Sequence, residues 1–203
     1  MPMEKTVPHP YLGHEFIGYV INSDFSKASQ DKIAELQQKF VNELGDDVYT
    51  TEPERLHITL MDWVAPLVDY HRDKDKIFKE IFEQYDQAVE KSIKGIGPID
   101  IQFCTVSVGP EAIFLIGEDT GQYKAIRDSF LRQISLLPNT KMPPKIVHTT
   151  IARFSKVTDL EPIREFAIGQ SIDFTERVNY FRLLRSTDTT MKDPKIIKRY
   201  YLK

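Results

Sequence analysis

A chain of 203 residues, 41% hydrophobic and 28% charged, is long enough for one domain with a real core and has the composition of an ordinary soluble globular protein. Its single cysteine, Cys104, excludes an internal disulfide and a cysteine-based metal cluster, and fits the reducing cytoplasm in which we expect the protein. The first residues lack the apolar core of a secretory signal, and no apolar run approaches the roughly 20 residues that cross a bilayer, so we expect no membrane association.

The charge is unevenly distributed along the chain. The net charge is −3, but residues 177–203 carry eight basic and two acidic side chains, a balance of +6, which leaves −9 for residues 1–176. A basic end on an acidic body can concentrate phosphates at one side of a molecule. A solvated face that only keeps the protein soluble explains the same run equally well.

The first half of the chain alternates predicted strands and helices. Residues 15–21 form a buried apolar run typical of a strand, and 26–44 have apolar residues at helical spacing after a capping serine, Ser26. A strand is predicted around His57, and a second helix over 75–93.

The second half repeats this order. Residues 99–109 and 112–118 alternate as strands on either side of a Gly-Pro break, and a third helix is predicted over 121–137. A strand around His148 follows, then at most a short helix over 159–168. The tail, 174–186 and 195–202, supplies two more strands.

The two halves have the same order of predicted elements but negligible sequence identity. Each has an apolar strand, a helix and a strand with a His-x-Thr step, in "RLHITLMDW" (55–63) and "VHTTIARF" (147–154). We therefore predict an α+β fold with two pseudo-symmetric strand-helix-strand lobes and antiparallel-rich sheets around a central cleft. No linker separates the lobes, so residues 1–203 are predicted to form one bilobal domain.

Each His-x-Thr step has a chemical use. Residues i and i+2 of a strand share a face, so His57 lies beside Thr59, and His148 beside Thr150. A hydroxyl donates a hydrogen bond to a phosphoryl oxygen and an imidazole moves a proton, so two facing steps supply a base, an acid and phosphate ligands. Two such steps among five histidines are a few-per-cent event by chance, although one alone would indicate a core histidine.

The sequence lacks the motifs typical of other kinds of catalytic or metal site. A metal site would need a third ligand, and the sequence contains neither H-E-x-x-H nor a Cys/His cluster. There is no G-x-S-x-G elbow, no partner for Cys104, and no glycine-rich phosphate loop. The remaining histidines, His9, His14 and His71, show no useful spacing and are assigned to surface or loop positions.

Taken together, the two motifs and the duplicated layout resemble the 2H phosphoesterase superfamily, which includes RNA 2′,3′-cyclic phosphodiesterases, also called 2′-5′ RNA ligases. The resemblance covers nearly the whole chain. It implies a phosphodiesterase without metal or other cofactor that acts, as a monomer, on a nucleoside 2′,3′-cyclic phosphate or a short 2′-5′ or 3′-5′ oligonucleotide. The alternatives are a nucleotide- or RNA-end-binding module with little activity, and a hydrolase of a cyclic nucleotide signal.

The resemblance also implies roles for particular residues. His148 would be the base, His57 the acid, and Thr59 and Thr150 would hold the phosphate. Arg153 follows the second motif as in the family, but its odd offset from His148 requires a bend or the strand end to bring it to the cleft. Candidate base-stacking aromatics are Tyr11, Trp63 and Phe154, with core packing as the other reading for the last two.

Overall fold

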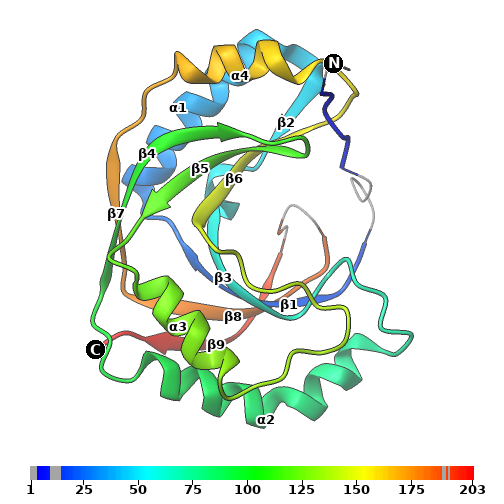
Figure 1. The fold of residues 1–203 in the computed structure, drawn as a ribbon, viewed down its shortest axis with the longest axis vertical. Coiled ribbons are helices and arrows are strands. Elements are labelled where there is room, and N and C mark those ends of the chain that lie inside the picture. Colours follow the sequence, from blue (N-terminus) through cyan, green and yellow to red (C-terminus); the bar gives the residue numbers. More distant parts are fainter. Residues whose placement is uncertain (1–3, 10–14, 189–190, 192) are drawn as a thin grey trace.

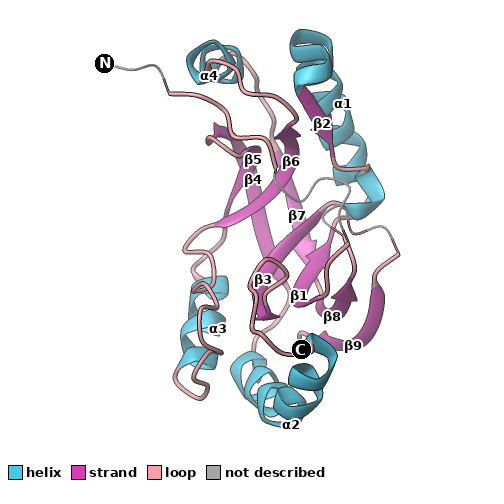
Figure 2. Ribbon diagram, turned by 90° about the vertical axis from the view of Figure 1, so that its right-hand side faces the viewer, coloured by secondary structure: helices cyan, strands magenta, loops and turns pink. Residues whose placement is uncertain are grey.

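The computed structural model describes residues 4–9, 15–188, 191 and 193–203, which fold into two sheets with helices at both ends of the molecule (Figures 1 and 2). The strands are β1 (Gly18–Asp24), β2 (Val48–Thr50), β3 (His57–Val64), β4 (Ile99–Val108), β5 (Ala112–Glu118), β6 (Val147–Phe154), β7 (Phe174–Val178), β8 (Tyr180–Ser186) and β9 (Lys195–Tyr201). The helices are α1 (Lys27–Leu44), α2 (Lys74–Ile93), α3 (Gln122–Leu131) and α4 (Leu160–Ile168), with short 3-10 turns η1 (Gly45–Asp47) and η2 (Pro53–Arg55).

Every strand pairing is antiparallel, and the two sheets have the orders β3-β1-β8-β9 and β2-β6-β5-β4-β7. The predicted α+β class with antiparallel sheets is confirmed. The three-residue strand β2 was not predicted, because it is too short to show a period. Residues 174–186 form two strands and not one: the chain breaks at Asn179, so that β7 ends the second sheet while β8 joins the first.

Local sequence signals fix where the helices begin. The Ser26 side chain accepts from the backbone amide of Ser29, and the Asp73 side chain accepts from that of Lys76 at 2.8 Å. The end of α3 was predicted six residues too late. After Leu131 the backbone turns, yet Ile134 still packs into the core and so prolongs the apolar period beyond the helix.

Two of the helices pack against the sheet of the other half of the repeat. Helix α1 follows β1 of the first sheet but packs against β2, β6 and β7 of the second. Helix α3 follows β5 of the second sheet but packs against β3 of the first and against α2 (Figure 1). Each sheet is therefore covered by a helix from the other half of the repeat, and this places helix side chains behind both His-x-Thr steps.

Most of the buried apolar side chains of both sheets belong to one cluster. It includes Ile58 and Leu60 of β3 and Ile151 of β6, which have no exposed surface and alternate with the residues of the His-x-Thr steps. Among the helices of the described residues, none has the length and apolar character needed to span a bilayer.

Candidate active site

The first His-x-Thr step begins β3, at the edge of the first sheet. His57 and Thr59 are half-buried, whereas Ile58 has no exposed surface. The register with β1 sets His57 beside Asp24 and Thr59 beside Asn22. The predicted alternation holds here, so the imidazole and the hydroxyl lie on one side of the sheet.

One ring nitrogen fixes the orientation of His57. Its Nδ1 lies 2.9 Å from the carbonyl oxygen of Arg55. Because a carbonyl only accepts, Nδ1 carries a proton and Nε2 is the nitrogen left for a ligand. Burial, opposed by the Arg55 carbonyl, lowers the pKa of His57 to about 4. The charges of Arg182 and Arg153 add to this shift in pKa, so the ring is neutral at pH 7 in the free protein.

The second step lies in β6, between β2 and β5 of the second sheet. His148 and Thr150 are half-buried and pair with Ile116 and Phe114 of β5. The Phe114 ring meets the imidazole of His148 at 85°, with the centroids 5.5 Å apart. Burial lowers the pKa of His148, and the charge of His148 in turn lowers the pKa of His57, so the two rings are electrostatic neighbours.

The second histidine is held more loosely than the first. The carbonyl of Ile146, two residues before His148 as Arg55 is before His57, raises the pKa of His148 against the effect of burial. This carbonyl also accepts from Arg127 at 3.3 Å. The buried Nδ1 of His148 makes no hydrogen bond of ordinary geometry to any described residue. Within the same part of the chain, neither the hydroxyl of Thr59 nor that of Thr150 makes a hydrogen bond to another residue.

A β-bulge brings Arg153 to the face of His148. In the pairing of β6 with β5, Thr150 lies opposite Phe114 and Ala152 opposite Ile113, so Ile151 is the extra residue. The bulge resets the alternation and turns Arg153, five residues after His148, to the cleft side. Its charge lowers the pKa of both His57 and His148. This is the bend that the odd offset required.

A β-bulge also follows the first His-x-Thr step, and a helix side chain donates hydrogen bonds to the backbone at each bulge. In β3, Thr59 lies opposite Asn22 and Met61 opposite Ile21, so Leu60 is the extra residue. The buried Arg127 of α3 donates from Nε to the Leu60 carbonyl and from Nη2 to the Thr59 carbonyl, both at 2.8 Å.

The bulge in β6 has a matching contact from α1, the other helix that packs against the sheet of the opposite half. The buried Gln37 of α1 donates from Nε2 to the carbonyl of Ile151 at 2.7 Å, and to that of Thr51 at the same distance. A bulge disturbs the regular ladder, and these side chains supply additional donors to carbonyls beside it; the Ile151 carbonyl also accepts from the backbone amide of Thr51 at 3.2 Å. Sequence reasoning missed both side chains, because they lie on helices far along the chain from the strands they support.

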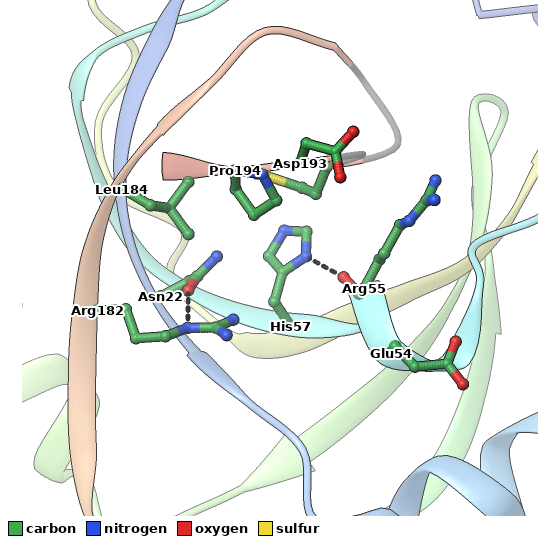
Figure 3. A pocket seen from close by; sticks show the side chains of 9 residues that line it. Asn22, Glu54, Arg55, His57, Arg182, Leu184, Asp193 and Pro194 are labelled. Atoms are coloured by element: carbon green, nitrogen blue, oxygen red, sulfur yellow. Dashed lines mark hydrogen bonds between the residues drawn. The ribbon is translucent and has the colours of Figure 1, made fainter. Parts of the chain in front are cut away.

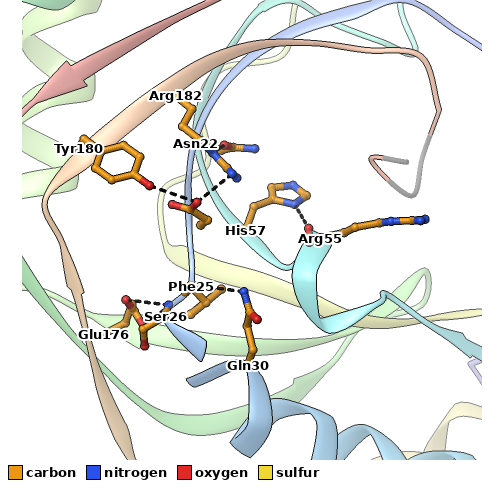
Figure 4. A network of polar contacts seen from close by, with 10 residues as sticks. Asn22, Phe25, Ser26, Gln30, Arg55, His57, Glu176, Tyr180 and Arg182 are labelled. Carbon is orange, nitrogen blue, oxygen red and sulfur yellow. Dashed lines mark hydrogen bonds and ion pairs between the residues drawn. The ribbon is translucent and has the colours of Figure 1, made fainter. Parts of the chain in front are cut away.

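Arg182 of β8 is a further cationic residue of the site. It donates from Nη1 to the carboxylate of Asp24 at 2.9 Å and from Nε to the amide oxygen of Asn22 at 3.2 Å (Figure 4). Sequence analysis counted it only within the basic tail. The available signal was alternation, because Phe181 and Leu183 on either side of Arg182 are fully buried.

A pocket of about 160 Å³ opens beside His57 (Figure 3). Its walls come from η2, from β1 and β8, and from the segment before β9, where Asp193 and Pro194 lie opposite the imidazole. The volume is below the roughly 300–1,000 Å³ of pockets that enclose a whole small ligand. It can take a phosphate group and part of what is attached to it.

The predicted base-stacking aromatics are not at this pocket. Trp63 has no exposed surface and packs against Phe78, Phe82 and Tyr85 within the core. The prediction of Trp63 as a substrate contact is therefore wrong for this structure, because no face of its ring is open to a base. Phe154 is also fully buried, and Tyr11 lies outside the described residues.

Several basic residues of the tail pair with carboxylates of the acidic body. Arg177 pairs with Asp100, Arg185 with Asp75, and Lys198 with Asp86 and Glu90. Exposed pairs of this kind reduce the positive field available to a polyanion. Across the residues that the structure describes, no three His, Cys, Asp or Glu side chains come together as a metal ion would require.

The sequence matches no protein-family model and no curated protein. The fold, however, has solved relatives. It superposes on TT0787 of Thermus thermophilus with a TM-score of 0.63 and 14% identity, covering 91% of this chain and 97% of that one. A protein described as a phosphoesterase gives 0.64 and 13%, with 92% and 98% covered.

E. coli LigT, solved with NADP+, gives a TM-score of 0.61 and 14% identity, with 93% of this chain and 99% of that one covered. LigT has also been solved with 3′-AMP and with phosphate. These are 2H phosphoesterase structures. The chain thus has the fold that its two His-x-Thr steps led us to expect.

Proposed function

We propose that the protein is a metal-independent phosphodiesterase that hydrolyses a nucleoside 2′,3′-cyclic phosphate or a short oligonucleotide. The proposal is supported by the contact between β3 and β6, the two strands that carry the His-x-Thr steps. Their imidazoles are electrostatic neighbours, their hydroxyls have no partner among the described residues, and Arg153 acts on both rings. The likeness to LigT, which binds nucleotides, supports a nucleotide ligand.

The proposed reaction is an in-line displacement at phosphorus. A neutral imidazole takes a proton from water as the water oxygen forms its bond to phosphorus. The bond from phosphorus to a ribose oxygen breaks, and the second, cationic imidazole protonates that oxygen. Thr59, Thr150 and Arg153 would hold the phosphoryl oxygens through hydrogen bonds to a charged acceptor.

The pKa values favour one division of labour between the histidines. Burial lowers the pKa of both histidines, and it lowers the pKa of His57 to about 4. The acid must be protonated when substrate is bound, and a bound anion raises the pKa of both rings. We therefore propose His57 as base and His148 as acid, the reverse of the assignment implied by the family resemblance.

Turnover in a chelator tests the proposed function. With excess EDTA, we expect the protein to convert 2′,3′-cyclic nucleotides to monophosphates, with the position of the product phosphate read by phosphorus NMR. Complete loss of turnover in EDTA would contradict the metal-independent mechanism. Binding of nucleotides without turnover of any phosphodiester would favour the alternative of a binding module.

Removal of a single hydroxyl should weaken phosphate binding. Thr59→Ala and Thr150→Ala should each lower kcat/KM by roughly 10- to 100-fold, the value of one hydrogen bond to a charged group of about 1.5–3 kcal/mol. Thr120→Ala, at an exposed position, is the matched control. Unchanged kinetics in both site variants would show that the hydroxyls do not touch the phosphate.

A further inference from the structure

The bulge in β3 turns one more ionisable side chain to the face of the sheet that carries His57 and Thr59. Asp62 lies five residues after His57, so strict alternation would put it on the opposite face. With Leu60 as the extra residue, Asp62 pairs with Val20 and Thr59 with Asn22. Val20 and Asn22 share a face of β1, so Asp62 shares the face of Thr59 and lies about 7 Å further along it, two residues of an antiparallel strand.

Asp62 and Arg153 occupy equivalent places in the repeat. Each is five residues after its histidine and follows a bulge that comes directly after its threonine. The two steps are otherwise alike, but one ends in a carboxylate and the other in a guanidinium. Asp62 and Arg153 therefore give the two steps opposite charges at equivalent positions.

The Asp62 carboxylate is half-buried and has no hydrogen-bond or ion-pair partner among the residues that the structure describes. Burial raises its pKa to about 6, opposed by the charge of Lys141. A desolvated carboxylate without donors is costly, and this cost is offset when a ligand brings donors to it.

We propose that Asp62 is a specificity-determining residue that accepts hydrogen bonds from the base of the substrate and selects guanine. The inference rests on the proposed function, in which Thr59 holds the phosphate. An ionised carboxylate only accepts hydrogen bonds and repels phosphate, so the part of a nucleotide that fits it is a base with N–H donors. Among the RNA bases, guanine presents two neighbouring N–H donors, N1–H and the 2-amino group, which two carboxylate oxygens can accept together.

The same arrangement fixes the direction of the substrate. A base reaching Asp62 lies beyond Thr59, and any additional phosphate then points to the side of Arg153 and Arg182. Reversal would set that phosphate against the Asp62 carboxylate and leave the base among the arginines. The opposite charges of Asp62 and Arg153 therefore remove the ambiguity that a pseudo-symmetric site would otherwise have.

Asp62→Asn tests the inference, because it keeps the shape of the side chain and removes its charge. We expect the wild type to favour guanosine over adenosine 2′,3′-cyclic phosphate roughly 10- to 100-fold in kcat/KM, the value of hydrogen bonds to a charged acceptor. Inosine 2′,3′-cyclic phosphate, without the 2-amino group, should fall between them. In the variant, the guanosine-to-adenosine ratio should drop to about 2-fold. Asp31→Asn, a carboxylate on α1 that pairs with Lys27 at the surface, is the matched control.

Two outcomes would overturn the inference about Asp62. One is an equal loss of kcat/KM on all three substrates in Asp62→Asn, with the guanosine-to-adenosine ratio preserved, which would make Asp62 a structural residue. The other is a wild-type protein that hydrolyses all three substrates without base preference. If the wild type hydrolyses none of the substrates, the proposed function is wrong. Calorimetric affinities for 3′-GMP and 3′-AMP then test whether Asp62 selects guanine. A preference for 3′-GMP that Asp62→Asn abolishes would uphold the inference, and equal affinities would overturn it.

Discussion

Replacement of either His57 or His148 with alanine is expected to lower kcat by about 10²- to 10⁴-fold, the usual contribution of a positioned acid or base. In the free protein both rings lie close to Arg153, and both have pKa values lowered by burial. Each variant removes one of the two proton transfers and leaves the phosphate ligands in place. Steady-state kinetics on a 2′,3′-cyclic nucleotide measures the loss, and His71→Ala, at an exposed histidine, is the matched control.

A substrate whose leaving group needs no proton distinguishes the histidine that acts as acid from the one that acts as base. p-Nitrophenolate departs without a proton, so a p-nitrophenyl phosphodiester should restore activity to the variant that lacks the acid. With His57 as base, the substrate should rescue His148→Ala and not His57→Ala. The opposite pattern would restore the assignment implied by the family resemblance. Near wild-type rates in folded His57→Ala and in folded His148→Ala would contradict the two-histidine mechanism.

Arg127→Met is expected to reduce the free energy of unfolding by about 2–4 kcal/mol, although the residue lies outside the cleft. The variant loses three hydrogen bonds to the carbonyls of Thr59, Leu60 and Ile146. Hydrogen bonds to a charged group contribute about 1.5–3 kcal/mol each, and part of the loss is recovered because a buried cation is removed. Denaturant unfolding measures the change.

Activity and pKa then separate positioning from simple stability. Arg127 ties the bulge after Thr59 to the residue two before His148, so kcat should fall at least tenfold at a temperature where the variant is fully folded. The charge of Arg127 lowers the pKa of His148, so its removal should raise that pKa, which NMR titration measures. A folded variant with wild-type kcat and an unchanged pKa of His148 would make Arg127 a purely structural residue.

The sequence by itself determined most of the helices and strands and the two His-x-Thr steps. Alternation identified the strands around His57 and His148, helical spacing identified α1 and α2, and Ser26 marked where α1 begins. These signals are local, since a side chain's face within a strand or helix depends on its immediate neighbours. The duplicated His-x-Thr step was readable for the same reason, and it led to the fold that the structure has.

Only the tertiary structure decided which charges share a face with the His-x-Thr steps. Asp62 and Arg153 are on the wrong face by strict alternation, and single extra residues, Leu60 and Ile151, turn them to that face. A bulge is a property of the pairing between strands, and here it is stabilised by Arg127 and Gln37 from helices that pack against the sheet of the other half of the repeat. No pattern within one strand encodes such contacts, because they depend on where distant segments pack.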